Sequence, residues 1–169
     1  EKPEVDEPAE VFACESYILP ALAEGQYFTE AGGNGDVVAP GTEITVSTTL
    51  YIYAETGDVY TVLCTDEYVF DINIENAPVV NAATALEECD DNNDGYADFN
   101  LTVAGAEVIG AQTGLTVTYH YTANDAQFGT NAISNPANVT NPGNSNIVYI
   151  RVITTGTTTN CASVVPVQL

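Results

Sequence analysis

The sequence predicts an all-β fold, made of two tandem small β-sandwich domains of the immunoglobulin-like type. Apolar and polar side chains alternate along residues 68–75, so that Phe70, Ile72 and Ile74 share one face of a strand. Glycine, proline and asparagine residues recur between such segments and limit them to the length of short strands. Short alternating strands separated by turns are typical of small antiparallel sandwiches.

Further strands are predicted where the same alternation recurs, at residues 50–54, 115–122, 147–153 and 164–169. The last two flank a turn rich in threonine, which predicts a terminal hairpin. His120 falls on the polar side of its strand, together with Thr116 and Thr118. We therefore expect the histidine to face solvent.

Residues 123–146 differ from their surroundings because they contain seven asparagines and two prolines, with no alternating segment. This composition predicts a long loop. No long helix is expected, although residues 101–109 and 124–128 have the length for one or two helical turns. The alternation of Leu101 with Phe99 and Val103 favours a core-facing strand position for Leu101.

The domain boundary is placed at Asn76-Ala77-Pro78. The predicted organisation is a linker at residues 1–10, a first sandwich at 11–77 and a second at 78–169. The first ten residues are acidic and contain two prolines, unlike the basic and apolar pattern of a signal peptide. We expect them to lead into a segment of a longer protein.

The chain is strongly acidic, with 24 acidic and 2 basic side chains and a formal net charge of −22. Lys2 and 16 acids lie before Pro78, and Arg151 and 8 acids lie from it onward. Such a surface repels phosphate backbones and anionic lipids, which excludes a nucleic-acid partner. No apolar run approaches the roughly 20 residues of a membrane span, so no membrane insertion is expected.

Four cysteines, Cys14, Cys64, Cys89 and Cys161, indicate the redox environment. They contain no CxxC pair and the chain has one histidine, so a zinc site is not expected. Three disulfide connectivities are possible, and the domain boundary selects Cys14–Cys64 with Cys89–Cys161 because it leaves two cysteines in each half. Disulfides indicate an oxidising compartment; four free thiols in a cytosolic protein are the alternative.

The segment CDDNNDGYADF, residues 89–99, matches the first nine positions of a calcium loop when counted from Asp90. Gly95 occupies position 6, where the loop turns sharply. Position 12 is Leu101 instead of a bidentate glutamate, so Glu87, Glu88 or a carbonyl of the long loop at 123–146 would complete the shell. The predicted ligands of a structural calcium ion are Asp90, Asn92, Asp94, the Tyr96 carbonyl and Asp98. The alternative is an acidic turn without metal.

The sequence offers little for catalysis. Nucleophilic mechanisms need a base beside the nucleophile, and the one histidine is expected on a solvent face. No enzymatic activity is therefore expected. Tyr51 and Tyr53 share the face opposite Leu50 and Ile52, where they would either stack on sugar rings or pack against a neighbouring domain.

Specific motifs occur in both halves of the chain. The first half contains CESYILPAL (14–22), GQYFT (25–29), TTLYIYA (48–54) and CTDE (64–67), and the second contains LEECDDNNDGYADFNL (86–101), DAQ (125–127) and VYIRV (148–152). Together they resemble repeats found in tandem in very large secreted proteins of the Bacteroidetes, including the SprB-type gliding-motility adhesins. The resemblance implies export by the type IX secretion system, a place at the bacterial cell surface, and neighbouring repeats of the same chain as partners.

Two hypotheses of function follow. The first is a non-enzymatic structural or adhesive segment of a large surface adhesin, involved in gliding motility and attachment to surfaces. The second is a carbohydrate-binding accessory segment of a secreted hydrolase, with Tyr51 and Tyr53 contacting extracellular polysaccharide. Loss of glycan binding on replacement of both tyrosines distinguishes the second from the first.

Overall fold

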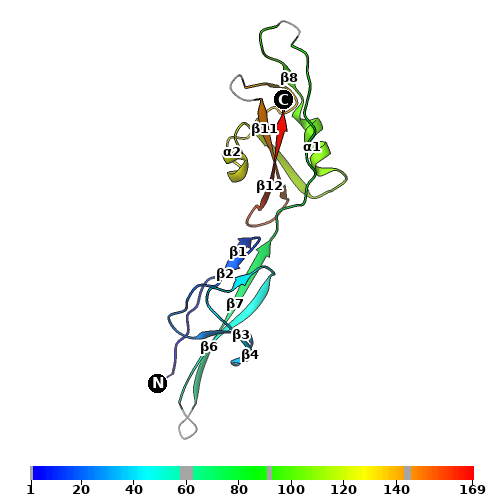
Figure 1. The fold of residues 1–169 in the computed structure, drawn as a ribbon. Coiled ribbons are helices and arrows are strands. Elements are labelled where there is room, and N and C mark those ends of the chain that lie inside the picture. Colours follow the sequence, from blue (N-terminus) through cyan, green and yellow to red (C-terminus); the bar gives the residue numbers. More distant parts are fainter. Residues whose placement is uncertain (1, 58–62, 91–92, 143–145) are drawn as a thin grey trace. The chain divides into compact units, whose positions relative to one another are not determined.

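The computed structural model describes residues 2–57, 63–90, 93–142 and 146–169. The chain divides into two compact units, Glu1–Asn76 (unit 1) and Ala77–Leu169 (unit 2). Most of the regular structure in both units is β-strand, distributed over several sheets (Figure 1). The all-β, sandwich-type prediction is confirmed. Within the described ranges, no helix has the length and apolar character needed to cross a membrane.

Unit 1 contains a five-stranded sheet and a two-stranded ribbon. Its strands are β1 (Val11–Cys14), β2 (Tyr17–Ile18), β3 (Gln26–Glu30), β4 (Asn34–Val38), β5 (Glu43–Ile44), β6 (Thr48–Thr56) and β7 (Cys64–Glu75). The sheet has the order β1-β7-β6-β3-β4, with β1 parallel to β7 and the other neighbours antiparallel. The ribbon pairs β2 with β5 in antiparallel orientation.

The core of unit 1 lies on one face of the five-stranded sheet, under the ribbon. Leu50 and Ile52 of β6 and Phe70 and Ile72 of β7 are buried, as the alternation predicts. Tyr17 of β2 approaches Phe70 edge-on, with the ring centroids 6.4 Å apart. Because full burial of one such apolar side chain contributes about 1.5–3 kcal/mol, this face supplies the main hydrophobic stabilisation of the unit.

The predicted linker at residues 1–10 belongs to unit 1. Val5 packs against the core, and the backbone N–H of Asp6 donates to the Glu24 carbonyl at 3.2 Å. Lys2 forms an ion pair with Asp66 at 2.6 Å, which raises the pKa of the lysine and lowers that of the aspartate. Backbone pairing and one apolar contact therefore fix a segment whose acidic composition indicates a linker.

Unit 2 contains a three-stranded sheet, a two-stranded ribbon and two short helices. Its elements are β8 (Asp98–Phe99), α1 (Leu101–Ile109), β9 (Leu115–His120), α2 (Ala123–Phe128), β10 (Val139–Thr140), β11 (Ile147–Thr154) and β12 (Ala162–Gln168). The sheet has the order β12-β11-β9 and the ribbon pairs β8 with β10, all antiparallel. The predicted terminal hairpin is confirmed as β11–β12. The two helices flank the three-stranded sheet on opposite sides (Figure 1).

Helix α1 covers one face of this sheet. The Asn100 side chain caps the helix by accepting the backbone N–H of Thr102 at 3.1 Å, which ends the strand after Phe99. Leu101 is buried, as predicted, but as the first residue of the helix. Val103 is 59 % exposed, so the strand alternation that places Leu101 in a strand is wrong. Successive helical residues point in different directions, whereas a strand would return Val103 to the face of Leu101.

Helix α2 covers the opposite face, where His120 lies. The prediction that His120 faces solvent is wrong, because the side chain is fully buried. Its ring nitrogens lie 2.9 Å from the Thr118 hydroxyl oxygen and 2.7 Å from the Thr130 carbonyl oxygen. The segment 123–146, predicted as a long loop with the length for one or two helical turns at 124–128, contains α2 and β10. Helix α2 is the reason that the polar face of the sheet is covered.

Candidate functional site

The disulfide chemistry involves one cysteine from each unit. Cys14 of unit 1 and Cys161 of unit 2 are disulfide-bonded, whereas Cys64 and Cys89 are free thiols. The predicted pairs, Cys14–Cys64 and Cys89–Cys161, each combine a bonded cysteine with a free one. The predicted connectivity is therefore wrong.

Strand length explains the error in unit 1. Cys64 is the first residue of β7, and Cys14 is the register partner of Glu75, the last residue of that strand. The eleven steps from Cys64 to Glu75 correspond to about 36 Å at ~3.3 Å per residue. A disulfide requires Cα atoms within about 7 Å of each other, so these two cysteines cannot be joined in this fold.

The cysteines of unit 2 lie toward opposite ends of β12. Cys161 directly precedes Ala162, the first residue of the strand. The backbone N–H of Leu86 donates to the carbonyl of Gln168 at 2.9 Å, so the segment that leads to Cys89 passes the far end of the same strand. Each unit thus carries one bonded and one free cysteine at separate ends of a long strand.

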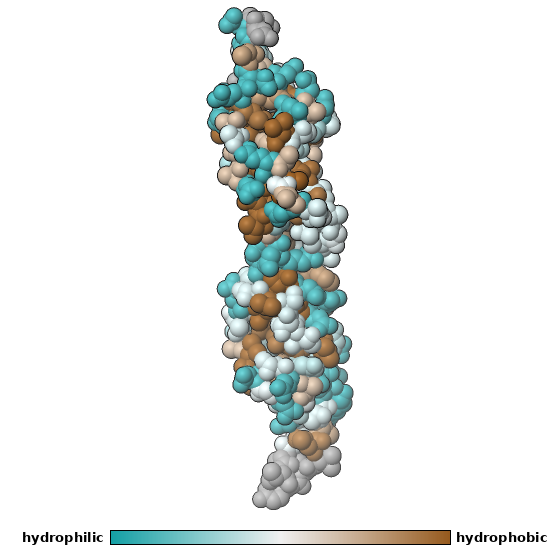
Figure 2. All heavy atoms as spheres, turned by 90° about the vertical axis from the view of Figure 1, so that its right-hand side faces the viewer, coloured by the Kyte–Doolittle hydropathy of each residue, from teal (hydrophilic) through white to brown (hydrophobic). Residues whose placement is uncertain are grey.

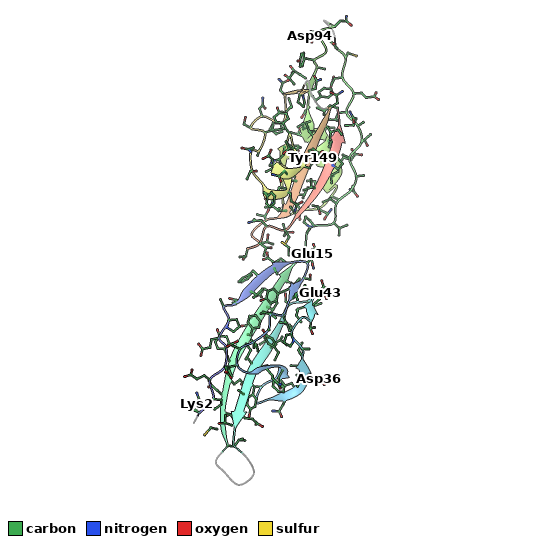
Figure 3. The ribbon with its side chains drawn as sticks, turned by 60° about the vertical axis from the view of Figure 1, so that its left-hand side comes forward. Lys2, Glu15, Asp36, Glu43, Asp94 and Tyr149 are labelled. Atoms are coloured by element: carbon green, nitrogen blue, oxygen red, sulfur yellow. The ribbon has the colours of Figure 1, made fainter. Side chains whose placement is uncertain are left out.

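Both bonded cysteines adjoin a residue with left-handed backbone geometry. Glu15, which follows Cys14, has φ 66°, and Asn160, which precedes Cys161, has φ 52°. The backbone N–H of Glu15 also donates to the Glu75 carbonyl at 2.9 Å, at the end of β1 (Figure 3). Left-handed backbone geometry is uncommon outside glycine. The backbone conformation of these two neighbours therefore determines the direction in which the chain leaves Cys14 and enters Cys161.

The acidic loop is organised by its own backbone amides. The two carboxylate oxygens of Asp90 accept the N–H groups of Asp94 at 3.2 Å and Gly95 at 2.7 Å. The Asp94 carboxylate accepts the N–H of Tyr96 at 2.9 Å. Asp94 lies at one end of unit 2 (Figure 3). These hydrogen bonds are those of an aspartate-rich turn.

Asp98, another predicted calcium ligand, is held by the neighbouring strand. Its carboxylate accepts the hydroxyl of Thr140 at 2.6 Å and the amide of Asn138 at 3.5 Å. Asn92 lies outside the described residues. Among the residues that the structure does describe, no three histidine, cysteine or acidic side chains form a group that could hold a metal ion. Calcium binding by this loop stays a prediction.

Tyr51 and Tyr53 point away from the core of unit 1, as predicted. Phe28 of β3 is the register partner of Tyr51 and meets the Tyr53 ring edge-on, with centroids 5.9 Å apart. The Tyr53 hydroxyl donates to Glu55 at 3.0 Å. Desolvation, followed by this hydrogen bond, raises the pKa of Tyr53. The rings are therefore held in fixed positions on the outer face of the sheet.

A row of apolar side chains crosses this outer face. It runs through Val37, Phe28, Tyr51 and Val69, each the register partner of the next. Val37 and Val69 are 59 % and 51 % exposed. A hollow of about 370 Å³, lined in part by Phe28 and Tyr53, opens beside the row. Apolar residues also lie among hydrophilic ones on the face of the molecule drawn in Figure 2.

A buried cation that the sequence did not predict lies close to the bonded cysteine of unit 2. Arg151 of β11 is 9 % exposed, and its Nη2 donates to the carbonyl of Asn160, the residue before Cys161, at 2.9 Å. The signal was available in the sequence. Arg151 alternates with Ile150 and Val152, so the sequence places it on the polar face of its strand. Its register partner Thr118 shares that face with His120, and α2 covers it.

The fold and the bonded cysteines define a class of protein: β-rich, disulfide-bearing and located in an oxidising environment. A family model described as FIDD, the Flavobacterium inter-domain disulphide bond domain, matches residues 85–169, and the chain belongs to this family. No curated protein matches the chain. The family and the disulfide together indicate an extracellular protein of Flavobacterium type, outside the cytoplasm.

Proposed function

We propose that this chain is a non-enzymatic structural segment of a large secreted adhesin of the bacterial cell surface, in which a Cys14–Cys161 disulfide ties unit 1 to unit 2. One observation carries the proposal. Of the four cysteines in the sequence, one in each unit is bonded and the other in each unit is free. The family description, which names an inter-domain disulfide, supports the same pairing.

Such a bond closes a long loop of chain. On the chain-entropy model, a disulfide between residues 14 and 161 lowers the entropy of the unfolded chain. This raises the free energy of the unfolded state by about 5 kcal/mol. It also limits independent motion of the units in the folded state. Both effects suit a segment that bears load between neighbouring repeats of one chain.

Peptide mapping by mass spectrometry without reduction tests the pairing. The expected result is a Cys14 peptide joined to a Cys161 peptide, with Cys64 and Cys89 alkylated as free thiols. A Cys64→Ala, Cys89→Ala double variant is the matched control and keeps the same crosslink. A crosslink that involves Cys64 or Cys89 contradicts the proposal.

The role in adhesion, gliding motility and type IX secretion is a further part of the proposal. It is supported by the family assignment to Flavobacterium together with the sequence resemblance to repeats of gliding adhesins. Antibodies raised against the fragment should label intact cells of the organism that encodes it and should reduce both attachment to glass and gliding. Labelling that appears only after cell lysis contradicts a surface location.

Structural calcium remains part of the proposed function as well. Asp90 and Asp94 lie in one loop of unit 2, Asp98 begins β8 shortly after them, and calcium prefers such oxygen ligands. Calcium at a hundredfold excess over its dissociation constant should stabilise the fold by about 2.7 kcal/mol. The melting temperature of chelator-treated protein should rise with calcium, and Asp94→Ala should remove the rise. Equal melting temperatures with and without millimolar calcium contradict the site.

The outer face of unit 1 favours a second candidate function, binding of extracellular polysaccharide. Its row of partly exposed apolar side chains includes Phe28 and Tyr51, and ring faces of this kind stack on the apolar faces of sugars. A glycan array tests it. Binding by the wild type that is lost in a Tyr51→Ala, Tyr53→Ala variant supports this function, with Tyr121→Ala of unit 2 as the control. Silence of the wild type on the array contradicts it.

A further inference from the structure

Arg151 is an unusual side chain for its position. It is the only lysine or arginine from residue 77 onward, in a segment with 8 acids, yet it is 9 % exposed. It lies in the middle of β11, opposite Thr118 of β9 and Val164 of β12. Neighbouring strand residues alternate between faces, so Arg151 projects to the α2 side of the sheet.

The burial of this cation is not explained by an ion pair. Arg151 forms none within the described part of the chain, and its buried Nε has no hydrogen-bond partner there. Desolvation lowers the pKa of the guanidinium. A buried charge that lacks an opposite charge is costly unless hydrogen bonds to other polar groups offset the loss of hydration.

The hydrogen bond that Arg151 does make fixes the approach to Cys161. Its Nη2 donates to the Asn160 carbonyl at 2.9 Å. That carbonyl belongs to the planar peptide group that also contains the Cys161 nitrogen, so fixing one fixes the other. The Thr159 hydroxyl oxygen lies 2.8 Å from the Cys161 Sγ on the same turn.

The end of α2 lies close to the guanidinium. A Cβ at Gly129 would lie 3.3 Å from the Cζ and the Nε of Arg151. The absence of a side chain at Gly129 therefore leaves room for the planar group beside the end of α2. Arg151 connects the helix end to the turn that presents Cys161.

We propose that Arg151 is a positioning residue for the disulfide. By holding the Asn160–Cys161 peptide group, it fixes the orientation of the Cys161 backbone before the bond to Cys14 forms. The inference rests on the proposed Cys14–Cys161 pairing. This preorganisation favours the bonded state, because less conformational entropy is lost when the bond forms.

The equilibrium between this disulfide and glutathione measures the effect. Two molecules of reduced glutathione are oxidised to one glutathione disulfide, while the protein S–S bond is reduced to the Cys14 and Cys161 thiols. Arg151→Met keeps an unbranched chain of similar length but removes the donor. Loss of one charge-assisted hydrogen bond should shift the equilibrium constant about tenfold toward the thiols.

Arg151→Lys should shift the constant in the same direction but less, because an ammonium keeps the charge and one donor without the planar fork. Tyr149→Leu, two residues away on the same face of β11, is the matched control and should leave it unchanged. A role in stability alone would destabilise the oxidised and reduced forms equally and leave the constant unchanged. The equilibrium constant with glutathione therefore distinguishes a positioning role of Arg151 from a role in the stability of the fold.

The outcomes are distinct. Wild-type protein that forms no Cys14–Cys161 bond in oxidised glutathione refutes the proposed pairing. Wild-type protein that forms the bond, together with an Arg151→Met variant of unchanged equilibrium constant, overturns the positioning role alone. If Arg151→Met does not fold in far-ultraviolet circular dichroism, Arg151→Lys decides the question, and an unchanged constant for it overturns the inference.

Discussion

The two units use the same strand alternation for different purposes. In unit 1 the face opposite the core carries Tyr51 and Val69 and remains partly exposed. In unit 2 the face opposite the core carries His120 and Arg151, and α2 covers it. The polar face of a strand is therefore an outer surface in one unit and an interior in the other.

This difference changes what each polar side chain requires. A polar group on an open face is satisfied by water, whereas a buried one needs a partner in the protein. The ring nitrogens of His120 both lie within hydrogen-bond distance of oxygens of Thr118 and Thr130. Unit 1 is thus stabilised mainly by one apolar layer, and unit 2 by an apolar layer and a polar one.

The largest predicted effect removes the centre of the apolar layer of unit 1. Phe70 is fully buried, so Phe70→Ala should destabilise this unit by about 3–5 kcal/mol. Hydrogen exchange followed by mass spectrometry should show faster exchange in residues 2–57 and 63–76. Val69→Ala, on the exposed face of the same strand, is the control and should change little. Equal effects of the two variants would mean that the core is not on the Phe70 face.

The corresponding test in unit 2 is Leu101→Ala on α1. Leu101 is fully buried, and its truncation should cost about 2–5 kcal/mol, with faster exchange across the described parts of residues 77–169. Val103→Ala is the control because Val103 is 59 % exposed on the same helix. A strand at this position would make Val103 the more sensitive residue, so the pair also tests the helix itself.

The same comparison explains what the sequence could predict. Period-two alternation is local, so it correctly assigned the core faces around Ile52 and Phe70. It does not report what covers the second face, and for that reason the environment of His120 was predicted wrongly. The residues Asn100 and Thr122 are the caps of the two helices and are the local signals that would have corrected the reading.

The disulfide and loop predictions depend on distances that a sequence does not contain. Dividing four cysteines between two units ignores the length of β7, which separates Cys64 from the position of Cys14. The calcium loop was recognised by ligand spacing. Its aspartates at positions 90 and 94 accept amides of the loop itself, and no spacing rule distinguishes that arrangement from a metal shell.

A smaller effect is expected where α1 meets the sheet. A Cβ at Gly105 would overlap the hydroxyl of Tyr119, which is buried in the core of unit 2. Gly105→Ala should therefore destabilise by about 1–3 kcal/mol, although alanine is the better helix former. Gly105→Ala combined with Tyr119→Phe, which removes the hydroxyl, should recover part of the loss. Urea unfolding curves of the two variants measure the difference; a gain in stability from Gly105→Ala alone would contradict the contact.

The smallest predicted effect is the loss of stability at low pH in the segment that carries α2. Asp125 accepts hydrogen bonds from Thr122, Asn131 and Thr130, which lower its pKa. A lowered pKa means that the stabilisation is complete above the unfolded value of 3.8 and is lost as the pH falls below it through the folded value. In Asp125→Asn, whose amide carries no charge and does not titrate, residues 122–131 should already be less stable at pH values where the wild-type carboxylate is ionised, and the acid transition caused by Asp125 should be absent. Amide signals followed by nuclear magnetic resonance from about pH 5 to about pH 2.5 measure this, with Asp36→Asn of unit 1 as the control. Identical acid transitions of this segment in the wild type and in Asp125→Asn would show that the carboxylate does not hold the α2 loop.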